Sequence, residues 1–297
     1  MTNTTAPRAS LTVEETEFYR TNGYVIVRGV LSSEEISELQ AVTDEFMERS
    51  RSMTESDNVI ELDQGHSADS PRIRRIKSPH KHHDAYARSL SNPKILDLVQ
   101  SLIGPNIRWH HTKLNAKAPE GGRQVEWHTD WGYYPHTNAD LLEVGIGLDP
   151  ITIENGCLHI LAGSHLGPVW DHYEGDRFVG AVAPGSFDMD AAVPVELELG
   201  DISMHHVRVL HGSAPNLSTN TRRLLLQGYA AADAWPLMAH HQPDDWPPWD
   251  ERMLRGEPTR DPRLDGSPVR IPLPVQRALG LFDTQAQMAQ SHYEGET

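Results

Sequence analysis

Apolar residues recur at two different spacings in the first third of the chain, and each spacing predicts a different element. Apolar positions three or four residues apart predict a helix at 32–51, and Thr12 as an N-cap followed by acidic residues in the first turn predicts another at 11–22. A β-branched run bounded by glycines predicts a strand at 23–29 between them. Residues 84–103 return to the helical spacing. Because proline starts a helix more readily than it continues one, Pro93 is expected to divide them into two helices.

From residue 106 to 230 the apolar segments become short and are separated by Gly, Pro, Asn and Asp. Many short segments punctuated by turn residues are typical of an all-β sandwich or barrel. Asn155-Gly156, between two apolar segments, indicates a hairpin turn. The fold class predicted is therefore mainly β with flanking helices. The expected strands are 107–117, 124–130, 142–148, 157–161, 193–199, 201–210 and 222–229.

Nine prolines lie between residues 236 and 274, which excludes a central strand there. We expect an ordered, proline-stiffened excursion over the β core, with its tryptophans as packing anchors, and then a C-terminal helix near 275–290. No internal repeat and no linker divides the chain, so one domain is predicted for residues 1–297. Its parts are a helix-rich segment, 11–105, the β core, 106–230, and the excursion with the final helix, 231–297.

Composition narrows the classes of function. Of the 297 residues, 38% are hydrophobic and 23% charged, which allows a sizeable core. The net charge of −16 disfavours nucleic acid and anionic membranes as partners, because both attract basic surfaces. The single cysteine, Cys157, excludes an intrachain disulfide. The chain shows no secretory signal and no apolar run of membrane-spanning length, so we expect a cytoplasmic protein.

The stretch Trp127-His128-Thr129-Asp130 carries candidate metal chemistry. Residues two apart in a strand point to the same face, so His128 and Asp130 are expected to share one. His211, in a later apolar run that ends in a turn, is expected on a facing strand. Two imidazoles and one carboxylate form the facial triad that binds non-heme Fe(II) and leaves positions open for substrate and oxygen. A His-x-Asp pair also arises by chance, but its place between two tryptophans and the later His-Gly-Ser favour the metal site.

The chain has 17 histidines, so most of them need another interpretation. The polar surroundings of the group at 80–83 and of His240-His241 predict exposed positions. Structural positions, or positions beside the ligands, are expected for His110, His111, His205 and His206. Of these, His111 is the candidate for a place on the inner wall of the barrel.

Arg222 and Arg223 open an apolar run that follows His211. Consecutive residues of a strand face opposite ways, so only one of the two can point inward. A buried arginine is unfavourable unless an anion meets it, and a guanidinium binds a carboxylate with two hydrogen bonds. Beside an iron site, that carboxylate could be the far end of 2-oxoglutarate. The alternative is that both arginines are surface charges paired with acidic neighbours.

Six motifs together resemble those of the phytanoyl-CoA dioxygenase family, over roughly residues 14–235. The resemblance implies a double-stranded β-helix, which is a cupin-like jelly roll, and an oxygenase that uses Fe(II), 2-oxoglutarate and O2. The motifs are Asn22-Gly23-Tyr24-Val25-Ile26-Val27-Arg28-Gly29, Lys113-Leu114-Asn115, Trp127-His128-Thr129-Asp130, Glu154-Asn155-Gly156, Gly163-Ser164-His165 and His211-Gly212-Ser213 followed by Arg222.

The resemblance also implies roles for single residues. His128, Asp130 and His211 would bind iron, and Arg222 with Ser213 would bind the distal carboxylate of 2-oxoglutarate. Asn115 stands where the ectoine hydroxylase branch of the family places an asparagine that contacts 2-oxoglutarate. His111 stands where that branch has a glutamine, so this second contact departs from the pattern.

The reaction implied is hydroxylation of a small-molecule metabolite, with release of succinate and CO2. Related enzymes that halogenate lack the carboxylate ligand, so the presence of Asp130 favours hydroxylation over halogenation. Desaturation, epoxidation or ring chemistry at the same site is the first alternative. A jelly-roll binding protein without activity is the second, and it would not need Arg222 or Asn115.

Substrate-binding candidates lie in three places. Trp131, Tyr133 and Tyr134 follow the iron motif and are expected at the rim of the pocket or as a cover over the core. Arg75, beside the polar loop at 52–70, is expected either in a lid that contacts an anionic group or at a solvated strand edge. Lys113 shares a motif with the co-substrate candidate Asn115 and is included for that reason.

Overall fold

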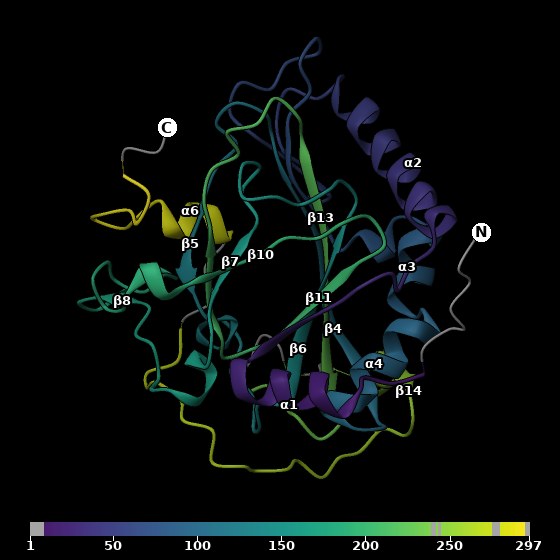
Figure 1. Ribbon diagram of the computed structural model, residues 1–297, viewed down its shortest axis with the longest axis vertical. Helices are drawn as coiled ribbons and strands as arrows, with labels where there is room; N and C mark the ends of the chain where they lie inside the picture. The colour runs from purple at the N-terminus through teal and green to yellow at the C-terminus, as the bar shows by residue number, and fades with distance from the viewer. Residues whose placement is uncertain (1–8, 239–241, 243–244, 275–279, 295–297) are drawn as a thin grey trace.

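Two antiparallel sheets face each other in the computed structural model, which describes residues 9–238, 242, 245–274 and 280–294 (Figure 1). The strands of the large sheet run in the order β1 (Tyr24–Val27), β11 (Ile202–His206), β6 (Leu141–Gly147), β13 (Arg222–Ala231), β4 (Ile107–Lys117), β3 (Ile73–Lys77) and β2 (Ile60–Leu62), and β14 (Met253–Arg255) also pairs with β4. The small sheet has the order β10 (Val193–Val195), β7 (Leu158–Leu161), β12 (Leu210–Ser213) and β5 (Val125–His128). A separate ribbon pairs β8 (Tyr173–Glu174) with β9 (Arg177–Phe178).

Three helices, α2 (Ser33–Ser50), α3 (Asp84–Leu90) and α4 (Pro93–Ile103), cover the side of the large sheet that faces away from the small sheet, whereas α6 (Leu281–Gln285) lies beside β5 of the small sheet (Figure 1). Thr12 and Ser32 form capping boxes before the first two helices, and Asn92 accepts a hydrogen bond from the amide of Lys94. The further α-helices are α1 (Val13–Asn22) and α5 (Trp246–Asp250). The 3-10 turns are η1 (Pro79–Lys81), η2 (Asp130–Gly132), η3 (Ser164–Leu166) and η4 (Met189–Ala191). None of the helices formed by the described residues is long and apolar enough to cross a membrane.

The predicted fold class is confirmed, and so is the division of 84–103 into two helices. The predicted strand at 201–210 is wrong in one respect, because a turn at 207–209 divides it between the large and the small sheet. Asn155-Gly156 is a turn between sheets rather than a hairpin, since β6 and β7 do not pair. The polar loop at 52–70 contains β2, which was not predicted. Of the predicted C-terminal helix, 275–279 lie outside the described residues.

The pairing of β4 with β13 decides which side chains enter the space between the sheets. Arg222 lies opposite Lys117, Leu224 opposite Asn115, and Leu226 opposite Lys113. Because side chains alternate along a strand, these positions share the face that looks toward the small sheet. The intervening positions of β13 face the helices, where the guanidinium of Arg223 binds Asp44 of α2. The cavity described below opens from this shared face.

Candidate iron and 2-oxoglutarate site

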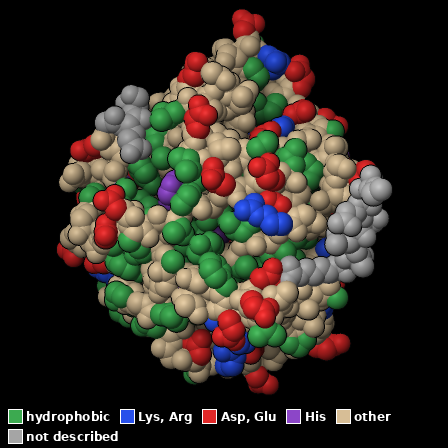
Figure 2. Space-filling model, viewed as in Figure 1, with side chains coloured by type: hydrophobic (Ala, Val, Ile, Leu, Met, Phe, Trp, Pro, Cys, Tyr) green, Lys and Arg blue, Asp and Glu red, His purple; other side chains and the backbone are tan. Residues whose placement is uncertain are grey.

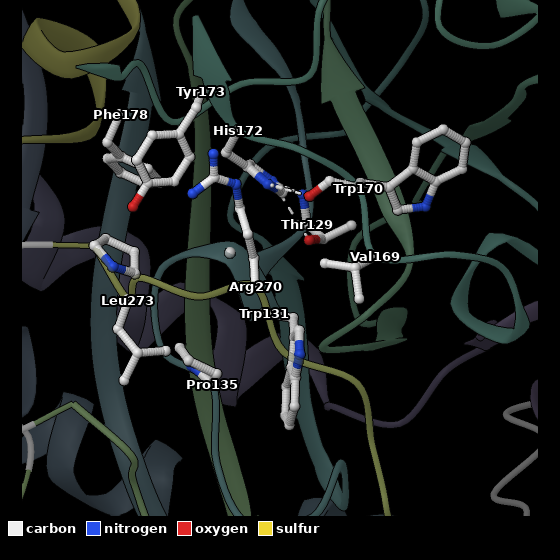
Figure 3. A pocket seen from close by; sticks show the side chains of 12 residues that line it. Thr129, Trp131, Pro135, Val169, Trp170, His172, Tyr173, Phe178, Arg270 and Leu273 are labelled. Carbon is white, nitrogen blue, oxygen red and sulfur yellow. Dashed lines mark hydrogen bonds between the residues drawn. The ribbon is translucent and has the colours of Figure 1, made fainter. Parts of the chain in front are cut away.

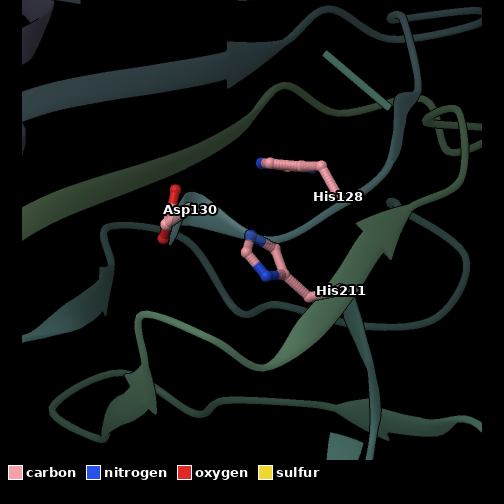
Figure 4. A group of neighbouring side chains, drawn as sticks. All are labelled: His128, Asp130 and His211. Atoms are coloured by element: carbon pink, nitrogen blue, oxygen red, sulfur yellow. The ribbon is translucent and has the colours of Figure 1, made fainter. Parts of the chain in front are cut away.

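His128, Asp130 and His211 lie together at one end of the small sheet. His128 ends β5, Asp130 begins η2, and His211 lies on β12 directly opposite His128. One potential ligand atom from each residue lies within 4.8 Å of the other two, and the side chains point toward a common centre (Figure 4). All three residues are buried. Two nitrogens and one carboxylate oxygen converge here, which is the donor set that suits a non-heme iron.

The triad forms by a route that differs from the prediction. β5 ends at His128, so Asp130 does not share a strand face with it; the 3-10 turn η2 brings the carboxylate round instead. His211 lies on the neighbouring strand of the same sheet and not on a facing one. The amide of Trp131 donates to the carbonyl of Val207, which fixes η2 against the turn between β11 and β12.

Backbone carbonyls orient both imidazoles. Nδ1 of His128 lies 2.8 Å from the carbonyl oxygen of Glu126, and Nδ1 of His211 lies 3.0 Å from that of Val209. A carbonyl only accepts, so each Nδ1 carries the proton and each Nε2 keeps a lone pair for a metal. Burial lowers the pKa of His128 to about 4 and that of His211 well below its usual value, which keeps both rings neutral.

Burial alone would raise the pKa of Asp130, but the adjacent His205 and the charge of Lys113 hold it well below its usual value. Nε2 of His205 lies 3.5 Å from Oδ2 of Asp130. The carboxylate is therefore ionised while the two imidazoles are neutral. These are the protonation states in which all three groups bind a metal.

The triad opens into a cavity of about 660 Å³, including its mouth, and buried cations lie at the other end of it. Arg222 and Lys117 both line this cavity, and less than 5% of either residue is exposed. Nη2 of Arg222 donates to the carbonyl of Gly156 at 2.9 Å, and Nζ of Lys117 donates to Oγ of Ser213 at 2.8 Å. Burial lowers the pKa of Arg222 to about 10 and that of Lys117 well below its usual value.

No carboxylate of the described residues pairs with either cation. Like charges directly opposite in a sheet are destabilising, and a buried charge without a counter-ion is costly. An anion bound between Arg222 and Lys117 would remove both penalties. Arg223, in contrast, pairs on the helix side with Asp149 at 2.8 Å and with Asp44 at 2.6 Å. The structure therefore places Arg222, and not its neighbour, in the cavity.

Asn115 and Ser213, the other candidates for contact with 2-oxoglutarate, also line this cavity. Oδ1 of Asn115 accepts from Nε of Arg75 at 3.1 Å, which leaves the amide hydrogens of Asn115 for the cavity. Arg75 is not at a solvated edge: its guanidinium lies 5.1 Å from the centre of the Phe282 ring. His111 is turned to Glu143, with Nε2 at 2.9 Å from Oε1.

The three aromatic candidates do not line the triad cavity. Nε1 of Trp131 donates to the carbonyl of Pro268 at 2.8 Å, and the hydroxyl of Tyr133 donates to that of Gly180 at 2.5 Å. Tyr134 contacts Glu143, with 3.4 Å between its hydroxyl and Oε1. These residues cover and support the site, which was the alternative to a place at the pocket rim.

Trp131 instead lines a second pocket of about 350 Å³ behind Thr129 (Figure 3). His172 lies on its wall, where Nε2 accepts from the amide of Thr129 at 2.9 Å and Nδ1 lies 2.8 Å from the carbonyl oxygen of Trp170. Arg270 stacks on the Tyr173 ring. Both ring nitrogens of His172 thus have partners, and the residues that line this pocket support the loop that carries Asp130.

Sequence reasoning did not single out Lys117 and Glu143, and for His205 it offered either a structural position or a position beside the ligands. Each lines the cavity and is buried. A charged residue inside the apolar strand at 141–147 was the available signal for Glu143. Lys117 continues the alternate positions of β4 that begin at His111, and His205 alternates with Ser203 on β11. The predicted surface histidines include His80, which is in fact half-buried and lies 2.5 Å from the hydroxyl of Thr112; His240 and His241 lie outside the described residues.

Comparisons with known proteins agree with this geometry. The family model described as phytanoyl-CoA dioxygenase (PhyH) matches residues 19–224. A Stutzerimonas stutzeri protein named "probable alpha-ketoglutarate-dependent hypophosphite dioxygenase" is 35% identical over 288 residues, covering 94% of this chain and 99% of that protein. The peroxisomal phytanoyl-CoA dioxygenase of Homo sapiens is 27% identical, with 75% of this chain and 69% of that protein covered.

Among solved structures, iron-bound EctD from S. alaskensis matches with a TM-score of 0.66 and 21% identity, over 89% of each chain. That likeness shows the shared double-stranded β-helix. The family match and the relatives agree with the presence of the buried His-Asp-His triad. The chain belongs to the phytanoyl-CoA dioxygenase family and is an Fe(II)- and 2-oxoglutarate-dependent dioxygenase.

Proposed function

We propose that His128, Asp130 and His211 bind one Fe(II), that Arg222 and Lys117 bind the distal carboxylate of 2-oxoglutarate, and that the enzyme hydroxylates a small molecule. One observation carries the proposal: the triad and two buried cations without carboxylate partners open into the same cavity. With 2-oxoglutarate and O2, bound iron supplies the oxidising power, and the co-substrate is consumed to succinate and CO2.

The donor atoms fit iron. The two Nε2 lone pairs are directed by carbonyl contacts at Nδ1, so neither ring has to reorient when a metal binds. Oδ2 of Asp130 is buried and makes no hydrogen bond among the described residues. A buried carboxylate oxygen in this state is stabilised by a cation, which supports a metal at the centre of the triad.

The opposite end of the cavity fits a dicarboxylate. The guanidinium of Arg222 binds one carboxylate through two parallel hydrogen bonds, and the ammonium of Lys117 adds charge beside it. Ser213 is fixed by its contact with Lys117, so its hydroxyl hydrogen can turn to the bound carboxylate. Asn115 lines the same cavity with its Oδ1 already paired to Arg75, so its amide hydrogens are available to the middle of the co-substrate.

The cavity limits the size of what reacts. The triad and Arg222 line one cavity, so 2-oxoglutarate and the reacting part of the substrate have to share it. The relative named as a hypophosphite dioxygenase is named for a very small anion, and we propose hypophosphite as the first substrate to test. Analysis of the product separates hydroxylation from desaturation, epoxidation and ring chemistry at the same site.

The test of the site is an anaerobic titration with Fe(II) and 2-oxoglutarate. We expect one iron per chain and a weak visible charge-transfer band when the co-substrate binds. Asp130→Ala should lose the iron, the band and succinate formation. Glu143→Gln removes a carboxylate from the same cavity but outside the triad, so this control should keep its iron. If Asp130→Ala binds iron as the wild type does, the proposed ligand set is wrong.

A further inference from the structure

Lys113 is a charged side chain in the cavity that iron and 2-oxoglutarate leave unused. It lies on the inward face of β4 and lines the same cavity as the triad. Among the described residues no carboxylate forms an ion pair with it.

The register neighbour of Lys113 on β3 shows the contrast. Lys77 lies directly beside it in the sheet, but Nζ of Lys77 is 3.3 Å from Oε1 of Glu61 and does not line the cavity. On the other side, the neighbour on β13 is Leu226, which is uncharged. Of these two lysines at the same register, Lys77 has a carboxylate partner, and Lys113, in the cavity, has none within the described part of the chain.

In the complex with Fe(II) and 2-oxoglutarate, no negative charge is left to balance that of Lys113. If the proposed function holds, the two charges of Fe(II) and the one of Arg222 cancel those of Asp130 and of the 2-oxoglutarate dianion. The ammonium of Lys117 adds one positive charge beside Arg222, and the carboxylate of Glu143, which lines the same cavity, offsets it with one negative charge. Lys113 thus keeps one positive charge near the metal, and one negative charge would balance it.

Hydrogen-bonding groups accompany this charge. Ser203 and His205 alternate on β11 and line the cavity with Lys113. Nδ1 of His205 has no hydrogen-bond partner among the described residues. Gly145, on the neighbouring strand, leaves room for the Ser203 hydroxyl, because a Cβ there would lie 2.6 Å from its Oγ. An ammonium group with an imidazole and a hydroxyl in one small cavity is suited to an anionic oxygen group.

We propose that the primary substrate is a small anion whose charged group is bound by Lys113, with Ser203 and His205 as hydrogen-bonding partners. The chemistry shared by carboxylates, phosphonates and sulfonates meets this description. The inference rests on the proposed function, because it requires iron and 2-oxoglutarate to occupy the triad and Arg222. The surface supplies little of the charge: acidic side chains outnumber basic ones on the face in Figure 2, and the whole chain carries −16.

The experiment measures binding to the anaerobic Fe(II) and 2-oxoglutarate complex of the full chain, through the change in its charge-transfer band. The anionic probes are acetate, methylphosphonate and methanesulfonate, and dimethyl methylphosphonate is the neutral counterpart. We expect at least one anion to perturb the band and the neutral ester to have no effect. Lys113→Met should weaken the response roughly 10- to 100-fold, as loss of one partner of a buried charge pair does. Lys77→Met, the matched control, should bind as the wild type does, and Lys113→Arg should restore part of the affinity.

Three outcomes would overturn the inference. The first is that none of the three anions perturbs the wild-type band. The second is that Lys113→Met responds to the anion as strongly as Lys77→Met. The third is that Lys113→Met needs more than tenfold more 2-oxoglutarate to form the band, which would assign the lysine to the co-substrate. Absence of any band in the wild type is a different result, and it would contradict the proposed function itself.

Discussion

Replacing Arg222 by glutamine tests the co-substrate site most directly. The substitution removes a guanidinium that is 3% exposed and whose only hydrogen bond to a described residue goes to the carbonyl of Gly156. A neutral amide cannot form the paired, charge-assisted hydrogen bonds that a carboxylate receives from arginine. Arg222→Gln should therefore bind 2-oxoglutarate weakly while the triad, which lies on the small sheet, keeps its iron.

The size of the loss follows from burial. Truncating one partner of a buried charge pair costs about 2 to 5 kcal/mol, and about 3 kcal/mol corresponds to roughly 150-fold weaker binding. At a 2-oxoglutarate concentration 100 times the wild-type Kd, linkage stabilises the wild type by about 2.7 kcal/mol. The same concentration would stabilise the variant by only about 0.3 kcal/mol. The co-substrate should thus raise the melting temperature of the wild type and leave that of the variant nearly unchanged.

Two assays check this prediction: thermal unfolding against 2-oxoglutarate concentration, and the KM for 2-oxoglutarate in succinate formation. Arg223→Gln is the matched control, because it removes the next guanidinium of β13 from the face that contacts Asp149 and Asp44. It should cost stability of about 1 kcal/mol and leave the KM unchanged. The reasoning is refuted if Arg222→Gln keeps a KM within threefold of the wild type, or if Arg223→Gln loses as much.

Three further changes have predictable effects. His205→Phe removes the contact 3.5 Å from Asp130 and should weaken Fe(II) binding about tenfold in a competition titration; unchanged affinity would exclude a positioning role. Burial lowers the pKa of His206 to about 3, below the ~6.5 of an unfolded histidine, so the unfolded chain binds more protons between these values and the free energy of unfolding should decrease as the pH falls through this range. In denaturant unfolding between about pH 6.5 and pH 4, His206→Asn should therefore lose less stability than the wild type. Gly228→Ala would place a Cβ 2.6 Å from Oε1 of Glu143 and should destabilise the protein by about 1 to 3 kcal/mol in urea unfolding; a cost below about 0.5 kcal/mol would show that the carboxylate moves freely.

The helices and most strands could be predicted because their signals are local. Asn92 and Pro93 begin a helix wherever they stand, and the structure confirms both. The turn at Asn155-Gly156 was recognised from its residues, but its role was not. Whether a turn joins neighbouring strands or carries the chain to another sheet depends on which distant strands pair. For the same reason the run at 201–210 looked continuous, although it changes sheets between His206 and Leu210.

The site was predicted where a short motif carries the chemistry and missed where pairing decides it. His128 and Asp130 are close in the chain, so their proximity survives even though the strand ends between them. Lys117 can be assigned to the cavity only once it is known to lie opposite Arg222, 105 positions later in the chain. No local sequence pattern reveals that register. Glu143 likewise needs the pairing of β6 with β13 before it can be placed in the cavity.

The two ends of the cavity belong to different sheets. His128 and His211 lie on the small sheet, and Arg222 lies on β13 of the large sheet. A dicarboxylate bound as proposed, from the triad to Arg222, would therefore contact both sheets at once. Succinate is one carbon shorter than 2-oxoglutarate, so it would not reach from the triad to Arg222 in the same way. The spacing of the two sheets would thus let the site distinguish 2-oxoglutarate from succinate.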